Sequence, residues 1–287
     1  LKCMRPLNAL QQALSTAVRE PIVLGVAALV ALLQIPIFLS QLLPPLYAAI
    51  ASLGANLLIL LVTPFTQAGM LGLADRALDG QGDFQTFLSA GREHYVSVFG
   101  AYLVLIAVNI ALAIATIIIF LVFGAGLGAV AAGTGGGGAG GALSGGVGAL
   151  GFALVGVVAL IGLAYLVGFL FIQFYAQAIV IDGYSAVSSF KRSAGLVRQH
   201  LLSTLGYSLV GLVIGGGAGI VIGVTSTLIN GNAPGMMDLS ASSPALIGGL
   251  ILLVIVLSTA SSAFGSLYSV AFYRDLDPNE TDSVSQL

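Results

Sequence analysis

Few side chains in this sequence have the chemistry of a catalytic or metal site. The two histidines, His94 and His200, occupy equivalent places in two similar stretches, and the chain holds only one cysteine. A tetrahedral zinc site needs further nitrogen or sulfur ligands that the sequence does not supply. Glu93 adjoins His94, but neighbours on a helix point about 100° apart, so the two do not face one substrate. The sequence therefore predicts no metal, no cofactor and no catalytic residue.

Neutral amides are the main polar groups inside the predicted membrane spans. No Asp, Glu, Lys, Arg or His falls in a predicted hydrocarbon core. Because such groups usually mark ion or proton pathways, their absence argues against a proton-coupled carrier. Amides within a membrane most often hydrogen-bond between helices, and the alternative is a binding site for a neutral solute. The residues that would form such an intramembrane polar site are Asn56, Asn109, Gln173 and Gln177.

The composition places these groups in a membrane protein. Of 287 residues, 58% are hydrophobic and 7% are charged, whereas soluble domains carry about 25% charged residues. The net charge of −2 gives no basic field for nucleic acid. The lone Cys3 cannot form an internal disulfide.

Six apolar runs are long enough to cross a bilayer, which takes about 20 residues. They cover residues 21–43, 47–73, 96–121, 150–180, 204–228 and 244–273, with Pro21 opening the first and Pro64 inside the second. Residues 124–148 are mostly Gly and Ala and contain no lysine, which excludes a phosphate-binding P-loop and predicts a flexible linker. Residues 274–287 are predicted to be an acidic, disordered tail.

A polar, amphipathic segment precedes every second span. Residues 6–20 carry leucines at helical spacing, Asp83 is a suitable N-cap for the second segment, and Ser185 for the third. The second and third copies align over a shift of 106 positions with seven identities, at Phe84/Phe190, Arg92/Arg198, His94/His200, Ser97/Ser203, Gly100/Gly206, Leu103/Leu209 and Val104/Val210. We predict an all-α membrane bundle forming one domain over residues 1–273. It consists of three units, about 5–74, 83–181 and 185–273, each an interfacial helix followed by a transmembrane hairpin.

The positive charges fix a predicted orientation. All nine Lys and Arg residues fall on one side of the six predicted spans. The positive-inside rule then places both termini in the cytoplasm and the protein in the cytoplasmic membrane. Basic interfacial helices suit anionic lipid headgroups, at about 1 kcal/mol per Lys or Arg. The predicted headgroup-level residues are Arg19, Arg92, His94, Lys191, Arg192, Arg198 and His200.

The fifth span carries glycines four residues apart, at Gly211, Gly215, Gly219 and Gly223. Glycine costs up to about 1 kcal/mol relative to alanine in a helix. Close approach of a neighbouring helix would compensate that cost, so the four glycines are predicted to form a packing face. The alternative is that the spacing has no structural role and arose by neutral drift in a glycine-rich sequence.

The segment I-D-G-Y-S-A-V-S-S-F-K-R-S-A-G-L-V-R-Q-H, residues 181–200, resembles a turn-helix motif of uncharacterised six-span membrane proteins. These proteins are common in haloarchaea and are similar to the membrane domain attached to some bacterial glycerophosphodiester phosphodiesterases. The matching positions are Phe190, Arg192, Ser193, Leu196, Val197, Arg198 and His200, and the chain departs from the motif at Ala194 and Gln199. The resemblance implies a membrane domain of unknown function.

Two functions are consistent with these features. The first is a non-enzymatic scaffold or accessory component of the cytoplasmic membrane, with membrane lipids and an unidentified membrane protein, or a second copy of the chain, as partners. The second is a facilitator or transporter for a small neutral or amphiphilic solute or lipid. An enzyme acting on lipids ranks third, with no residue nominated for catalysis.

Overall fold

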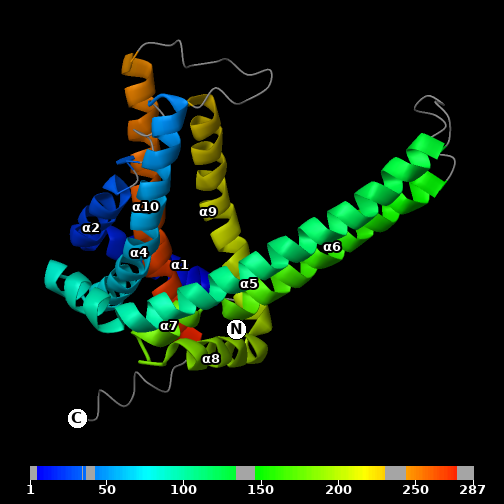
Figure 1. The fold of residues 1–287 in the computed structure, drawn as a ribbon. Helices are drawn as coiled ribbons and strands as arrows, with labels where there is room; N and C mark the ends of the chain where they lie inside the picture. The colour runs from blue at the N-terminus through cyan, green and yellow to red at the C-terminus, as the bar shows by residue number, and fades with distance from the viewer. Residues whose placement is uncertain (1–4, 34, 37–42, 134–145, 230–243, 277–287) are drawn as a thin grey trace. The chain divides into compact units, whose positions relative to one another are not determined.

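The computed structural model describes residues 5–33, 35–36, 43–133, 146–229 and 244–276, and all of its labelled elements are helices (Figure 1). They are α1 (Arg5–Arg19), α2 (Pro21–Leu32), α4 (Pro45–Leu78), α5 (Phe84–Gly133), α6 (Gly146–Ile172), α7 (Tyr175–Val180), α8 (Ala186–Gln199), α9 (Leu201–Ile229) and α10 (Pro244–Leu276). Among the described residues, five helices are long and apolar enough to cross a membrane, or six if the bent pair α1 and α2 counts as one span. The chain is a helical membrane protein.

The chain divides into two compact units. The first comprises residues 1–100 and 173–287, and the second comprises residues 101–172. Within the first unit, α10 is the central helix and packs against α1, α2, α4 and α9. The C-terminal part of α10 carries the largest fully buried side chains of this core, including Tyr273, Phe272 and Leu267. The second unit contains the rest of α5 together with α6.

The first predicted span differs from the structure. Pro21 begins α2 at a first-turn position, as expected. However, α2 has only 12 residues, or about 18 Å, which is too short for a hydrocarbon layer of about 30 Å. It meets α1 at 87°. The transmembrane span predicted over 21–43, with a kink at Pro36, is therefore a continuous helix only as far as Leu32, and residues 34 and 37–42 of that range lie outside the described residues.

The second amphipathic segment is not a separate interfacial helix. It forms the first turns of α5, which continues unbroken for 50 residues. Asp83 caps this helix as predicted, because its Oδ1 accepts a hydrogen bond of 2.6 Å from the Thr86 amide. The linker prediction for 124–148 was wrong at both ends. Alanines among the glycines support helix up to Gly133 and again from Gly146, and residues 134–145 lie outside the described part of the chain.

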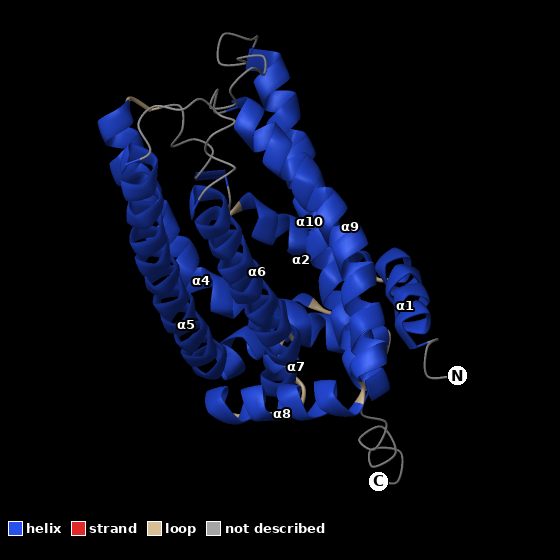
Figure 2. Ribbon diagram, turned by 90° about the vertical axis from the view of Figure 1, so that its right-hand side faces the viewer, coloured by secondary structure: helices blue, strands red, loops and turns tan. Residues whose placement is uncertain are grey.

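The third amphipathic segment does form a separate helix. α8 ends at His200, whose φ of −129° and ψ of 38° break the helix before α9 begins. Figure 2 shows α8 running crosswise to α9 and α10. Ser185 occupies the N-cap position but does not cap a backbone amide, because its hydroxyl pairs with the Ser188 hydroxyl at 2.8 Å. The threefold repeat remains a prediction.

Two predicted boundaries shift around these helices. The span predicted over 150–180 is interrupted at residues 173 and 174, which separate α6 from α7. α10 continues to Leu276, so the first residues of the predicted tail are helical. Residues 277–287 lie outside the described residues.

Two Asp-Gly turns end α4 and α7. Gly80 has φ +73° and Gly183 has φ +71°, and these are the only described residues with positive φ. Glycine adopts this left-handed conformation without the steric cost that a Cβ adds. Each turn places an aspartate, Asp79 or Asp182, beside the end of its helix, where the C-terminal end of α10 reaches both.

Candidate functional site

Consecutive residues at the end of α10 bind the aspartates of the two Asp-Gly turns. The Tyr273 hydroxyl donates to Asp182 Oδ2. The Arg274 guanidinium donates to both carboxylate oxygens of Asp79 at 2.9 Å, and its Nε donates to Asp75 Oδ1 at 2.8 Å. Paired hydrogen bonds of this kind are the strongest that arginine makes with a carboxylate. We call Tyr273, Arg274 and these three aspartates the α10 clamp.

The electrostatics of the α10 clamp follow from these contacts. The side-chain hydrogen bond from Arg274 lowers the pKa of Asp79 below its ordinary value of 3.8, against a smaller opposing effect of burial. Burial alone would lower the pKa of Arg192, but Tyr273, Asp182 and Tyr184 outweigh it and raise that pKa overall. These contacts tie the end of α10 to α4 and to the α7–α8 turn.

Arg192 belongs to this charged network as well as to α8. Its Nε lies 3.4 Å from Asp182 Oδ2, and its side chain is 30% exposed. Its guanidinium also lies 6.0 Å from the centre of the Tyr184 ring, within range of a cation–π contact. Sequence reasoning assigned Arg192 to lipid headgroups and did not foresee this carboxylate partner.

The remaining predicted headgroup residues are distributed over three helices. Lys191 and Arg198 are exposed on α8, Arg19 is exposed in the last turn of α1, and Arg92 is exposed on α5. The predicted headgroup histidines His94 and His200 are both half-buried. In the described ranges, no three His, Cys, Asp or Glu side chains are grouped so that they could hold a metal ion.

α8 is firmly seated on α7 through its inner face. Ser189, Ser193, Leu196 and Val197 are buried. The Ser193 hydroxyl accepts a hydrogen bond of 3.2 Å from the Phe174 amide, and the rings of Tyr175 and Phe190 stack at 5.4 Å. The amide of Phe174 is exposed by the break between α6 and α7, so Ser193 supplies a partner that the helix does not. The outer face of α8 is thereby held in a defined position.

Buried polar atoms gather around α7. Gln173 Oε1 accepts from the Ser208 hydroxyl at 3.0 Å, and the Tyr175 hydroxyl donates to Gln67 Oε1 at 3.3 Å. Five buried side-chain atoms have no protein partner among the described residues: Gln173 Nε2, Gln177 Oε1, Asp182 Oδ1, Thr204 Oγ1 and Tyr268 OH. An unpaired buried polar atom costs about 1 to 3 kcal/mol, so this region carries a hydrogen-bonding capacity that the described protein atoms leave unused.

The other two predicted intramembrane amides behave differently. Asn56 is exposed and donates to the Ser52 carbonyl of its own helix at 2.7 Å. Asn109, also exposed, donates to the Leu105 carbonyl at 2.8 Å, and the Tyr165 hydroxyl lies 3.5 Å from its oxygen. Bonds of this local type satisfy an amide within its own helix. Only Gln173 and Gln177 of the four therefore join the buried polar region.

The predicted glycine face on α9 has no close neighbour among the described residues. A Cβ built on Gly211, Gly215, Gly219 or Gly223 meets no atom within 4 Å. Close approach occurs instead between α4 and the start of α5. A Cβ on Gly69 would lie 2.6 Å from the Phe87 ring, and one on Gly91 would lie 2.8 Å from the Phe65 ring. A Cβ on Gly72 would overlap the Ala90 side chain.

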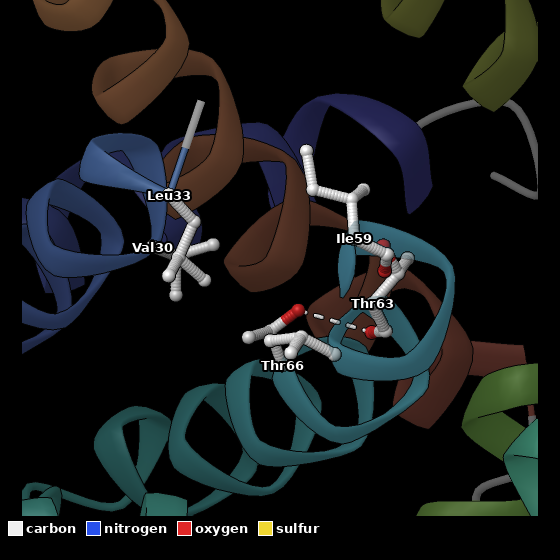
Figure 3. A pocket seen from close by; sticks show the side chains of 6 residues that line it. Val30, Leu33, Ile59, Thr63 and Thr66 are labelled. Carbon is white, nitrogen blue, oxygen red and sulfur yellow. Dashed lines mark hydrogen bonds between the residues drawn. The ribbon is translucent and has the colours of Figure 1, made fainter. Parts of the chain in front are cut away.

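A half-open pocket of about 170 Å³ lies between α2 and α4 (Figure 3). Val30 and Leu33 line one side, and Figure 3 shows them across the pocket from Ile59, Thr63 and Thr66 of α4. Val62 completes the lining. Sequence reasoning missed this pocket, because only the bend between α1 and α2 decides which part of α4 faces residues 30–33.

Comparison with known proteins identifies the family. No curated protein and no solved structure matches the chain. A family described as a domain of unknown function, DUF7847, matches residues 4–276, which is nearly the whole chain. Together with the membrane-length helices, this match shows that the chain is a membrane protein belonging to the DUF7847 family.

Proposed function

We propose that this chain is a non-enzymatic scaffold or accessory protein of the cytoplasmic membrane, in which α8 presents a basic surface to anionic lipid headgroups. The observation that carries the proposal is the two-sided character of α8. One side is buried on α7, while Lys191 and Arg198 are exposed on the other. A fixed basic helix of this kind acts as a surface for recognition and needs no reacting group.

The surroundings of α8 support an interfacial position. Val187 is 64% exposed and Leu202 is 78% exposed, next to the basic residues. A helix lying in the membrane surface combines apolar side chains that enter the acyl boundary with basic side chains that meet the headgroups. The predicted cytoplasmic side carries anionic lipid, which would contribute about 1 kcal/mol for each of Lys191 and Arg198. The resemblance to a membrane domain that accompanies some glycerophosphodiester phosphodiesterases is consistent with an accessory role.

The test measures which lipids the protein retains. The purified full chain is equilibrated with vesicles of equal phosphatidylglycerol and phosphatidylcholine, extracted gently, and analysed for bound lipid by mass spectrometry. A Lys191→Ala/Arg198→Ala variant should lose most of the phosphatidylglycerol enrichment, and added salt should mimic that loss because it screens charge. Gln199→Ala, an exposed neutral change on the same helix, is the matched control. An unchanged lipid ratio in the double variant would refute the headgroup surface.

The scaffold role itself is tested by assembly. Extraction of the full chain at its native salt, followed by mass determination, should reveal either a stoichiometric membrane-protein partner or a homo-oligomer. A chain that is monomeric and free of protein partners would reject the scaffold role, even if the lipid enrichment were retained.

A second candidate function is facilitated passage of a small neutral solute, and the unpaired polar atoms around α7 favour it. Gln173 and Gln177 supply an amide donor and an amide acceptor, which suit a molecule that carries both donors and acceptors. Proteoliposome flux of glycerol and of acetamide is the relevant measurement. A Gln177→Leu change should reduce such flux, whereas Asn56→Leu, at an exposed amide, should not. Equal flux in all three proteins would exclude this candidate.

A further inference from the structure

The pocket between α2 and α4 lies at the centre of a membrane-spanning helix. The span within α4 covers Leu46–Leu78, so residue 62 is its midpoint. The pocket-lining residues of α4 run from Ile59 to Thr66 and therefore surround that midpoint. On the other side, Val30 and Leu33 lie at the C-terminal end of the short α2. The α4 wall places the pocket near the middle of a hydrocarbon layer about 30 Å thick.

The pocket lining offers an occupant mainly apolar groups, although two of its residues are threonines. The Thr63 hydroxyl donates to the Ile59 carbonyl at 2.7 Å, and the Thr66 hydroxyl donates to the Thr63 carbonyl at 3.0 Å (Figure 3). These bonds use the only donor that each hydroxyl has. The threonines therefore offer no hydrogen-bond donor to an occupant, and the other four lining residues in the described part of the chain are Val, Leu and Ile.

Pro64 lies between these two threonines inside α4. It has no amide hydrogen, so the helix loses one backbone hydrogen bond at this level. Nearby, the Tyr95 hydroxyl of α5 donates to the Leu61 carbonyl at 3.0 Å. The Thr63, Thr66 and Tyr95 hydroxyls therefore all donate to backbone carbonyls of α4 and not into the pocket.

The rim of the pocket is continuous with the outer apolar surface. Leu29 and Leu33 of α2 are 55% and 38% exposed, and Leu58 and Leu61 of α4 are 53% and 51% exposed. Exposed leucines at the depth of the bilayer centre face lipid chains. An apolar cavity of about 150 Å³ is known to remain dry and to bind a group the size of benzene, and the pocket, at about 170 Å³, is comparable.

From these observations we infer that the pocket binds the terminal segment of one acyl chain of a membrane lipid. Its depth matches the place where acyl chains end, its lining matches hydrocarbon, and its open side faces the lipid. This site is separate from the headgroup surface on α8 and does not depend on that proposal. Its occupation would fill the space beside the short α2 and hold α2 against α4.

Photochemical labelling of the full chain tests the inference. The protein is reconstituted into phosphatidylcholine vesicles containing a phospholipid that carries a diazirine near the methyl end of its acyl chain. After illumination, the labelled residues are assigned by tandem mass spectrometry. Val62 and Thr66, which are only half-exposed, should be labelled several-fold more heavily than Leu212 of α9, which is 69% exposed. A phospholipid with its diazirine near the carbonyl group should label the pocket several-fold less.

Two variants separate pocket occupation from general contact with lipid. Val62→Phe fills the pocket and should reduce labelling of Val30 and Thr66 several-fold. Leu53→Phe adds the same ring at an exposed position on the opposite face of α4 and should leave that labelling unchanged. Circular dichroism and gel filtration confirm that both variants fold, and Ile59→Phe is the second filling variant if Val62→Phe does not.

Several results would overturn the inference. Labelling of the pocket no heavier than at Leu212, or equal reduction by Val62→Phe and Leu53→Phe, would show that no chain enters. Rapid modification of a Thr63→Cys protein by a membrane-impermeant thiol reagent, in a Cys3→Ser background, would show a water-filled pocket instead.

Discussion

Two glycine-bearing faces of this protein have opposite environments. On α4 and the first turns of α5, Gly69, Gly72 and Gly91 are buried, and an added Cβ would collide with the facing helix. On α9, four glycines at regular spacing have open space around them in the described part of the chain. The evenly spaced glycines of α9 were predicted to form a packing face. The unevenly spaced Gly69, Gly72 and Gly91 form the close helix contact instead. Spacing alone therefore does not identify a close helix contact, because the partner helix must also present a residue that fits.

The α4–α5 contact is also supported by aromatic rings. Phe87 packs edge-on against Phe65 at 5.7 Å and stacks on Phe84 at 5.9 Å. Gly69 and Gly91 provide the space for Phe87 and Phe65 respectively. Glycine on one helix and phenylalanine on the other thus interlock in both directions, an arrangement that rewards close approach through van der Waals contact.

The largest loss of stability is expected from Gly72→Ala, at the contact between α4 and α5. The new Cβ would overlap the Ala90 side chain, and overpacking of this kind costs about 1 to 3 kcal/mol. Unfolding in an SDS titration should shift to lower SDS. Adding Ala90→Gly removes the colliding atom and should restore much of the loss. If Gly72→Ala alone is neutral, the helices are not in contact at this level.

A smaller loss of stability is expected from Tyr273→Phe, which weakens the polar contacts of the α10 clamp. Tyr273→Phe removes the hydroxyl that donates to Asp182, whose side chain is 6% exposed. The carboxylate then retains Arg192 as its charged partner, and the loss should be about 1 to 3 kcal/mol, toward the lower end. Thermal unfolding followed by circular dichroism measures it. Tyr47→Phe, at a tyrosine that is 64% exposed, is the control and should be silent.

A pH-dependent effect is expected at Asp79. Because its folded pKa lies below the ordinary value of 3.8, the stabilisation is fully present above that value and is lost as the pH falls through the folded pKa. Asp79 is 51% exposed, so solvent screening limits the contribution to about 1 kcal/mol or less. The melting temperatures of the wild type and Asp79→Asn should differ at neutral pH, and the difference should shrink as the pH falls below 3.8 and through the folded pKa. A difference that persists in acid would contradict this origin.

The smallest change in stability is expected from Gly215→Ala, and it should be a gain instead of a loss. With open space around it, the added methyl group should be neutral or should stabilise α9 by up to about 1 kcal/mol. The same SDS titration measures the change. If Gly215→Ala is destabilising, and the loss coincides with dissociation of an oligomer in light scattering, then the α9 glycines pack against another copy. That result would remove the contrast between the two faces.

Part of the architecture was predictable because its signals are local. Pro21 at the start of α2, Asp83 as an N-cap and α8 as a separate amphipathic helix each depend on a few neighbouring residues. The continuity of α5 was missed because a polar segment can enter an apolar helix without a break when no residue interrupts its backbone hydrogen bonds. The end of α2 was missed because hydrophobicity continues beyond the point where the helix stops.

The candidate site also has features that the sequence predicted and features that it did not. The exposure of Lys191 and Arg198 was predictable from the amphipathic pattern of α8. The pairing of Arg192 with Asp182, ten residues earlier, and of Arg274 with Asp75, 199 residues apart, was not. The first pairing depends on how α8 folds back beside the turn after α7. The second depends on the position of α10, which brings together helix ends from distant parts of the sequence.

The amino-acid sequence by itself determined that this protein is a helical membrane protein, because hydrophobicity, charge placement and caps act over a few residues at a time. Only the tertiary structure decided which glycines lie in close contacts, which charged side chains pair at the α10 clamp, and where a pocket opens beside α4. These features depend on distances between helices, and the direction in which each helix leaves its turn sets those distances.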